Sequence, residues 1–173
     1  MNEFAIELRA YTAGSPLLEV GFGVYREVWP EREHEFEETR ESFERYATYA
    51  NFAGIVAFHG DRPVGVGYGA RSRPGIWWHD QVTPFFGEDH PALQDAWRLV
   101  ELAVVPDMRR RQVGGMIHDT LLASQGCRRA LLCTSVENTV AQAMYARRGW
   151  YTLHPGFDFP GQPVQYVILA REL

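Results

Sequence analysis

The sequence predicts an α/β (α+β) fold in which a central mixed, twisted sheet of about seven strands is flanked by about four helices. Three observations lead to this prediction. A chain of 173 residues fits one domain, residues 1–173, and can bury a substantial core. Apolar residues make up 46% and charged residues 23%, as in ordinary globular proteins. Strand and helix patterns follow one another in the order β-α-α-β-β-β-α-β-α-β-β, without a repeat or a linker.

The first part of the chain predicts a strand, two helices and a hairpin. Apolar and polar residues alternate over Phe4–Tyr11, which favours a strand, and Pro16–Val28 is typical of a short helix. In Glu31–Tyr49 aromatic residues recur at helical spacing, so we expect a second helix with these residues in the core. Gly54–His59 and Val64–Ala70 flank a Gly-Asp-Arg-Pro turn and form a hairpin, whose glycines allow another group to approach closely.

The second part predicts the rest of the sheet. Residues 73–96 are rich in Pro, Gly, Trp and His, and we interpret them as an irregular segment of a length that suggests function or mobility. The elements that follow are a buried strand (99–105) stopped by Pro106, a helix (113–125) closed by Gly126, a strand (130–135), a helix (138–148) closed by Gly149, and two strands (150–153 and 164–170).

Composition and charge argue against several classes of function. No apolar run reaches the ~18–20 residues that cross a bilayer, and Met1–Glu7 does not look like a signal peptide, so we expect a cytoplasmic protein. The net charge of −5 argues against nucleic-acid binding. Cys127 and Cys133 are too few for a disulfide framework, and Cys133 is expected as a small buried side chain. We expect no metal.

A turn from Pro106 to Gly115 joins the buried strand to the next helix and contains three consecutive arginines. The first N–H groups of a helix have no internal partners, and the helix dipole is positive there. Glycine lets a bulky anion come close, and arginines add charge-assisted hydrogen bonds. The turn therefore suits a diphosphate, although a purely structural turn is an equal alternative.

A second element lies in the later helix, where Asn138, Ala141 and Tyr145 share one face. A phenol at this place can donate a proton, and an amide can fix a ligand. The structural alternative is a half-buried tyrosine in a helix that begins at an asparagine N-cap.

Together, these two segments resemble the GCN5-related N-acetyltransferase (GNAT) superfamily. Its acyl-CoA signature, Arg/Gln-x-x-Gly-x-Gly/Ala after a strand ending near Val-x-Pro, matches Val104-Val105-Pro106 and Arg109–Gly114. Gln112 stands where the family usually has its first glycine, so its side chain is expected to point away from the diphosphate. The family's second motif, Asn-x-x-Ala-x-x-x-Tyr-x-x-x-Gly-Phe, matches Asn138, Ala141, Tyr145, Gly149 and Trp150.

The resemblance implies roles for individual residues toward acetyl-CoA. Backbone amides of the turn would hold the diphosphate, and the strand before it would pair with the pantetheine arm like an added strand. Tyr145 would protonate the leaving thiolate, because a neutral phenol is a proton donor. The residues expected at the cofactor are Ala103, Val104, Val105, Arg109, Arg110, Arg111, Gln112, Val113, Gly114, Gly115, Asn138, Ala141 and Tyr145.

In the reaction that the resemblance implies, a neutral amine attacks the thioester directly, so a base or a water chain must first take the proton of the amine. Glu101 is the first candidate, because it interrupts an apolar strand. Strand alternation leaves open which face of the sheet it occupies, and a structural or solvent-facing Glu101 is the alternative. His79 and Asp80 are weaker candidates, which we expect at the surface.

We expect transfer of an acetyl group from acetyl-CoA to a primary amine, and we expect this amine to be a small molecule. The alternatives are a protein N-terminus or lysine as acceptor, and a non-catalytic acyl-CoA-binding regulatory module. A homodimer is an open alternative, and no membrane or nucleic-acid partner is expected. Aromatic residues that either line the acceptor pocket or cover the core are Trp77, Trp78, Phe85, Phe86, Phe157 and Phe159.

Overall fold

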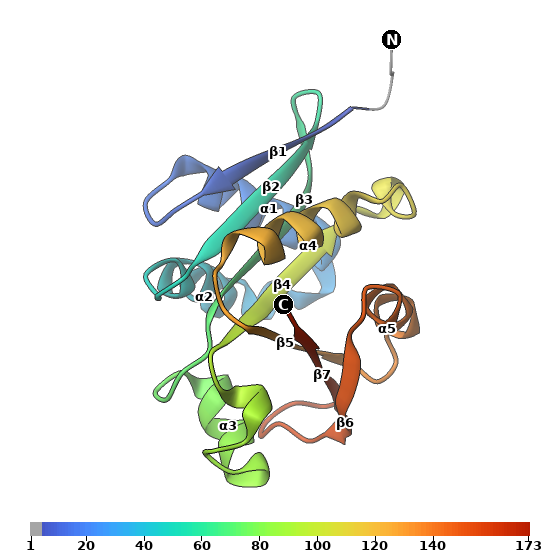
Figure 1. The fold of residues 1–173 in the computed structure, drawn as a ribbon. Coiled ribbons are helices and arrows are strands. Elements are labelled where there is room, and N and C mark those ends of the chain that lie inside the picture. The colour runs from blue at the N-terminus through green and yellow to red at the C-terminus, as the bar shows by residue number, and fades with distance from the viewer. Residues whose placement is uncertain (1–4) are drawn as a thin grey trace. The chain divides into compact units, whose positions relative to one another are not determined.

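The computed structural model describes residues 5–173, whose seven strands form one mixed sheet in the order β1-β2-β3-β4-β5-β7-β6 (Figure 1). The predicted α/β class is therefore confirmed. The strands are β1 (Ile6–Tyr11), β2 (Ala53–His59), β3 (Arg62–Arg71), β4 (Ala96–Val104), β5 (Arg129–Ser135), β6 (Tyr151–Phe157) and β7 (Tyr166–Glu172). The helices are α1 (Pro16–Val28), α2 (Phe36–Ala47), α3 (Trp77–Phe86), α4 (Val113–Ser124) and α5 (Thr139–Ala146), with 3-10 turns η1 (Pro30–Glu35), η2 (Pro91–Leu93) and η3 (Pro106–Met108).

The contacts of the chain divide it into two compact units. The first consists of the chain up to Ala70 together with Leu99–Gly126, and the second of Arg71–Arg98 together with Cys127–Leu173. Strand β4 contributes residues 96–98 to the second unit and residues 99–104 to the first.

The first unit contains β1, β2, most of β3 and the later part of β4. Strands β1 and β2 are antiparallel and place Tyr11 opposite Gly54, while β2 and β3 are antiparallel and place Gly54 opposite Tyr68. In Figure 1, α4 lies in front of these strands and α1 and α2 lie behind them. One face of the strands is thus covered by α4 and the other by α1 and α2.

Glycines allow helices to pack directly on both faces of β3 and its neighbours. A methyl group at Gly65 or Gly67 would lie only 2.7 Å from the side chain of Ile117 in α4. A methyl group at Gly21 of α1 would lie 2.8 Å from Val66 on the opposite face. The sequence-based expectation that the glycines of this hairpin permit a close approach is confirmed, and the approaching group is α4.

The second unit is built around β5 and β7. Residues Ala96–Arg98 of β4 pair in parallel with Arg129–Leu131 of β5, and β5 runs antiparallel to β7. Its core contains buried apolar side chains from α3, η2, β5, β7 and the segment before β7, among them Trp78, Val82, Leu93, Leu131, Phe159 and Ile168.

Two expectations of the sequence are wrong. The helix expected over Glu31–Tyr49 begins only at Phe36, because Arg32 leaves helical backbone angles (φ −94°, ψ 24°) and residues 30–35 form the separate turn η1. The segment 73–96, expected to be irregular, contains α3, so residues 5–173 hold five α-helices rather than about four. Helix α3 forms because Trp78 and Val82, one turn apart, are both buried. Phe4, expected in the first strand, lies outside the described residues.

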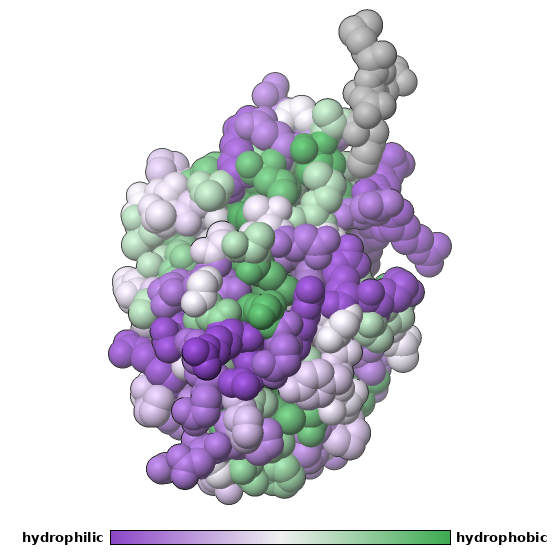
Figure 2. Space-filling view, in the orientation of Figure 1, coloured by the Kyte–Doolittle hydropathy of each residue, from purple (hydrophilic) through white to green (hydrophobic). Residues whose placement is uncertain are grey.

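The visible face of the molecule in Figure 2 is largely polar. Figure 2 shows hydrophilic residues over most of the visible face, with apolar surface in small patches between them. Within residues 5–173, no helix combines the length and the apolar character needed to cross a membrane.

Candidate active site

The connection from β4 to α4 turns twice through left-handed backbone. Arg110 (φ 61°) and Gln112 (φ 66°) both have positive φ, and Gln112 directly precedes α4. Glycine adopts this conformation without the steric strain that other L-residues meet. The requirement for a positive φ explains why the family pattern has a glycine where this chain has Gln112.

The N-terminus of α4 is open. Gln112 makes no side-chain hydrogen bond that caps the helix, and the first helical hydrogen bond runs from Met116 N to the Gln112 carbonyl. The N–H groups of Val113, Gly114 and Gly115 therefore precede the first intrahelical donor. Such N–H groups at the positive end of a helix dipole are suited to an anion.

An ion-pair network ties this turn to the rest of the first unit. Arg62 on β3 donates to both carboxylate oxygens of Asp107 (2.7 and 3.1 Å) and to Glu27 of α1 (2.8 Å). The hydrogen bond from Arg62 lowers the pKa of Asp107, and the charge of Arg111 acts in the same direction. Arg62 thus anchors the turn and counterbalances the one acidic side chain within it.

Some backbone groups expected to bind the pantetheine arm have partners within the first unit. Arg109 Nε donates to the Val104 carbonyl (3.1 Å), and Val105 N donates to the Val64 carbonyl (3.0 Å). Arg110 and Arg111 are exposed, and Ala103 is buried. The roles of these residues toward a cofactor remain predictions.

The side chain of Glu101 lies on the face of β4 that α1 and α2 cover. The next residue, Leu102, faces the opposite side, because its side chain lies 3.2 Å from the place where a Gly67 methyl group would be, beside α4. Consistently, the charge of Glu101 acts on Tyr11, Tyr25 and Tyr68. The face of Glu101, which the sequence left open, is therefore known, and its role as a base remains a prediction.

The charge of this carboxylate acts on three tyrosines that the sequence did not single out. Burial raises the pKa of Tyr11, Tyr25 and Tyr68, and the charge of Glu101 raises it further. The ring of Tyr11 crosses Gly54, where a methyl group would lie 2.5 Å from it. The Tyr11 hydroxyl is buried without a hydrogen-bond partner among the described residues. Strand register places Tyr11 and Tyr68 on either side of Gly54, and no local sequence pattern predicts this.

The second motif lies in the second unit. Asn138 is the N-cap of α5, where its Oδ1 accepts from Ala141 N (3.2 Å). Tyr145 is 6% exposed and makes an edge-to-face contact with Trp150 at a centroid distance of 5.7 Å. Gly149 (φ 82°) follows the helix in a left-handed conformation. The predicted helix stop is confirmed, and the Asn138 oxygen is used within the chain.

The remaining candidates also lie in the second unit. His79, expected at the surface, is buried, and its Nδ1 lies 3.0 Å from Ser72 Oγ; burial lowers its pKa. Asp80 is exposed, as expected, and accepts from Gly75 N. Of the loop aromatics, Trp78 and Phe159 belong to the core, whereas Trp77 and Phe85 are 52% and 60% exposed. Cys133, expected to be buried, is half-buried.

The site residues thus form two groups. The first unit contains Glu101, the tyrosines and the Pro106–Gly115 turn, and the second contains Asn138, Ala141 and Tyr145. Within the part of the chain that the structure describes, no cluster of three or more His, Cys, Asp or Glu residues could hold a metal ion.

Comparison with known proteins identifies the family. Residues 22–150 match the model of the acetyltransferase (GNAT) family. Over 120 residues, 64% of this chain, the sequence is 32% identical to the GCN5-like protein acetyltransferase Rv2170 of Mycobacterium tuberculosis. The match spans 58% of the length of that relative, which is less than two thirds of it.

Solved structures show the same fold at low sequence identity. PH1933 from Pyrococcus horikoshii is similar with a TM-score of 0.70 and 16% identity, over 98% of this chain and 99% of that one. An aminoglycoside N-acetyltransferase, AAC(6')-Iy in complex with CoA, is similar with a TM-score of 0.67 and 18% identity, over 92% of this chain and 96% of that one. Since the family model covers more than half of the chain, the protein belongs to the GNAT family of acetyltransferases.

Proposed function

We propose that this protein transfers the acetyl group of acetyl-CoA to the primary amine of a small molecule. The observation that carries the proposal is the open N-terminus of α4 after the left-handed turn at Gln112. Its N–H groups suit the diphosphate of acetyl-CoA. A member of the same fold, the aminoglycoside N-acetyltransferase, has been solved with CoA and carries a small-molecule acceptor in its name.

The chemistry proposed is direct attack. The lone pair of the neutral amine forms the new C–N bond at the thioester carbonyl, and the C–S bond breaks as the tetrahedral intermediate collapses. Glu101 takes the proton that the amine loses, either directly or through water, and Tyr145 protonates the thiolate of CoA. The support for Glu101 is that it is a partly buried carboxylate on β4 whose charge acts on three buried tyrosines.

A protein acceptor is the second candidate, since the relative with 32% identity is named a protein acetyltransferase. The two proposed acceptors, a small-molecule amine and a protein, would give different acetylated products. Acetylation of lysine-containing or free N-terminal peptides, with no thiol release in the presence of small amines, would favour the protein acceptor. Thiol release across a panel of small amines would favour the first reading.

Two measurements test the proposal. Calorimetry should show binding of acetyl-CoA, and absence of binding would overturn the function. In an assay of thiol release, Glu101→Gln should lower kcat/KM about 100-fold and leave the affinity for acetyl-CoA unchanged. The exposed Glu41 on α2 provides a control, because Glu41→Gln removes a carboxylate of the same unit outside this cluster. Binding without turnover on any amine or peptide would favour a non-catalytic module.

A further inference from the structure

Helix α3, the end of β6 and the connection that follows β6 carry a row of aromatic rings in contact with one another (Figure 1). The ring of Phe159 lies 5.7 Å from that of Trp77 and 4.7 Å from that of Phe157. The ring of Phe85 lies 5.7 Å from that of Phe157. Phe159 is buried, whereas Trp77 and Phe85, at the two ends of this aromatic row, are 52% and 60% exposed. The core thus anchors the row and leaves its two ends in solvent.

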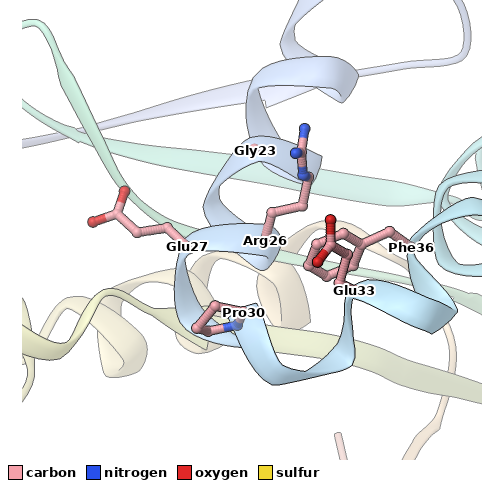
Figure 3. Close-up of a pocket in the computed structure, with 6 residues that line it drawn as sticks. All are labelled: Gly23, Arg26, Glu27, Pro30, Glu33 and Phe36. Carbon is pink, nitrogen blue, oxygen red and sulfur yellow. The ribbon is translucent and has the colours of Figure 1, made fainter.

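Aromatic rings of the first unit are covered by arginines of the chain itself. Guanidinium groups lie 4.3, 5.3 and 4.7 Å from the centres of three such rings. Figure 3 shows one of them, Arg26, extending beside Phe36 in a pocket of about 320 Å³. Within residues 5–173, no guanidinium lies over Trp77 or Phe85. These two rings therefore leave a face on which a cation from outside the chain can rest.

The segments that form the aromatic row are acidic. Residues 74–97 and 149–170 contain neither lysine nor arginine, although the chain has 17 residues of these two kinds. The C-terminal end of α3, next to Phe85, also carries the negative end of the helix dipole. Four carboxylates of these segments are exposed, namely Asp80, Glu88, Asp89 and Asp158.

Within the part of the chain that the structure describes, none of these four carboxylates forms an ion pair. Asp80 accepts a hydrogen bond from Gly75 N (3.0 Å), and Asp158 accepts one from the side-chain amide of Gln165 (3.1 Å), so both donors are neutral. Carboxylates of the first unit differ, since two of them pair with Arg62. The negative charge beside the aromatic row is therefore not balanced by the second unit itself.

We infer that this aromatic and acidic surface binds an extended segment of a partner protein, whose arginine or lysine side chains rest on Trp77 and Phe85. The neighbouring carboxylates complement the charge of that segment. This surface is a binding site in addition to the proposed catalytic function, and the inference does not rest on acetyl transfer.

The spacing of the two exposed rings suits a polypeptide. Trp77 and Phe85 belong to α3 and stand about 12 Å apart along its axis, at about 1.5 Å per residue. In an extended peptide, side chains four positions apart project from the same side at a separation of about 13 Å. Two cationic side chains of one segment can thus reach both rings, whereas a lone ammonium group contacts only one of them.

Fluorescence anisotropy with a labelled peptide tests the inference. The peptide is N-acetylated, contains no lysine, and carries two arginines four positions apart among glycines and serines, so it cannot accept an acetyl group on an amine. Its control has citrulline in place of arginine, which keeps the shape and removes the charge. The arginine peptide should bind about tenfold more tightly or better, and its binding should weaken as salt is added. Equal binding of the two peptides would overturn the inference.

Variants assign the binding to the surface. Phe85→Leu and Trp77→Leu keep an apolar side chain, remove one ring each, and should weaken binding of the arginine peptide about three- to tenfold. The triple variant Asp80→Asn, Glu88→Gln and Asp89→Asn should weaken it about tenfold. Because Phe85 and the three carboxylates are exposed, Phe85→Leu and the triple variant should keep the thermal unfolding of the wild type even if Trp77→Leu does not. Unchanged binding in both would contradict the inference.

A second triple variant separates this surface from the overall charge. Glu37→Gln, Glu38→Gln and Glu41→Gln remove three exposed carboxylates of α2 and change the net charge by the same amount. This variant should bind the peptide within about twofold of the wild type, since its charges lie outside the surface. An equal loss in the two triple variants would show attraction by net charge alone, and the inference would be wrong.

A competition experiment checks that the occupant is a polypeptide. Free argininamide, a single small cation, should displace the peptide only at concentrations about 30-fold higher or more, because it reaches one ring at a time. Competition at the same concentration as the unlabelled peptide would show that a small cation suffices, and the inferred protein partner would be wrong. No outcome here depends on thiol release, so the acetyltransferase proposal is tested separately.

Discussion

Two strand-to-helix junctions, one in each unit, have the same order of elements. They differ in whether a side chain caps the first N–H groups of the helix. Between β4 and α4 the residue before the helix, Gln112, is left-handed and provides no side-chain cap. Between β5 and α5 the corresponding residue, Asn138, caps the helix by accepting from Ala141 N. The first N–H groups of α4 receive no cap from Gln112, whereas Asn138 satisfies one of the first N–H groups of α5 within the chain.

The comparison shows that the two motifs contribute in different ways, although the sequence resemblance implied cofactor contacts for both. An open helix start can bind an anion through its backbone and needs no particular side chain beyond a tolerated positive φ. At the second junction, the Asn138 oxygen caps the helix, and the chemical role that we propose falls to the Tyr145 phenol.

The largest effect is expected at Tyr145. The Tyr145→Phe variant keeps the ring that contacts Trp150 and removes only the proton donor. Turnover should fall about 100-fold, because general acid catalysis typically contributes at least this factor. Affinity for acetyl-CoA, measured by calorimetry, should be nearly unchanged. A turnover number equal to that of the wild type would remove Tyr145 from the acid role.

Asn138→Ala tests whether the second junction is mainly structural. Loss of the cap should reduce the free energy of unfolding by about 1 kcal/mol, which lowers Tm by about 2–4 °C in a chain of this size. Asn138→Asp retains a capping oxygen and should restore most of the stability. A tenfold or greater loss of acetyl-CoA affinity in Asn138→Ala, with the fold intact, would instead assign the residue to the cofactor.

Arg62→Gln tests the support of the open junction. Without Arg62, the Asp107 carboxylate would repel a bound diphosphate, so acetyl-CoA affinity should fall about two- to fivefold, as expected for an exposed charge pair. Adding Asp107→Asn should restore it. An unchanged affinity in Arg62→Gln would show that Asp107 does not act on the ligand.

The Arg62–Asp107 pair also predicts how the stability of the fold changes with pH. Since Arg62 lowers the pKa of Asp107 in the folded protein, Asp107 stabilises the fold above its unfolded pKa, about 4, and this contribution is lost as the pH falls through the lowered value. The stability difference between the wild type and Asp107→Asn, measured by urea unfolding, should therefore shrink on acidification.

The smallest effect is expected at Gln112. Left-handed backbone costs a non-glycine residue about 1–2 kcal/mol, and glycine loses about 0.5–1 kcal/mol more entropy on folding, so Gln112→Gly should stabilise the protein by about 0.5 kcal/mol. Gln112→Ala keeps the strain and should bring no gain. A loss of stability in Gln112→Gly would contradict the strain argument.

Much of the secondary structure could be predicted from local sequence patterns. The seven strands, the hairpin and the helix stop at Gly149 follow from periodicity and turn residues, which act over a few positions. Helix α3 was missed because buried Trp78 and Val82, and not local propensity, stabilise it. Helix α2 was expected too long because Pro30 and the break at Arg32 were not recognised as a separate turn.

The sequence by itself determined the element order, the turn between β4 and α4, and the family resemblance that the family model confirms. Only the tertiary structure decided that Glu101 lies on the face of β4 covered by α1 and α2, and that its charge acts on the buried Tyr11, Tyr25 and Tyr68. The reason is physical: strand register and side-chain neighbours depend on contacts between residues far apart in the chain, which periodicity does not record.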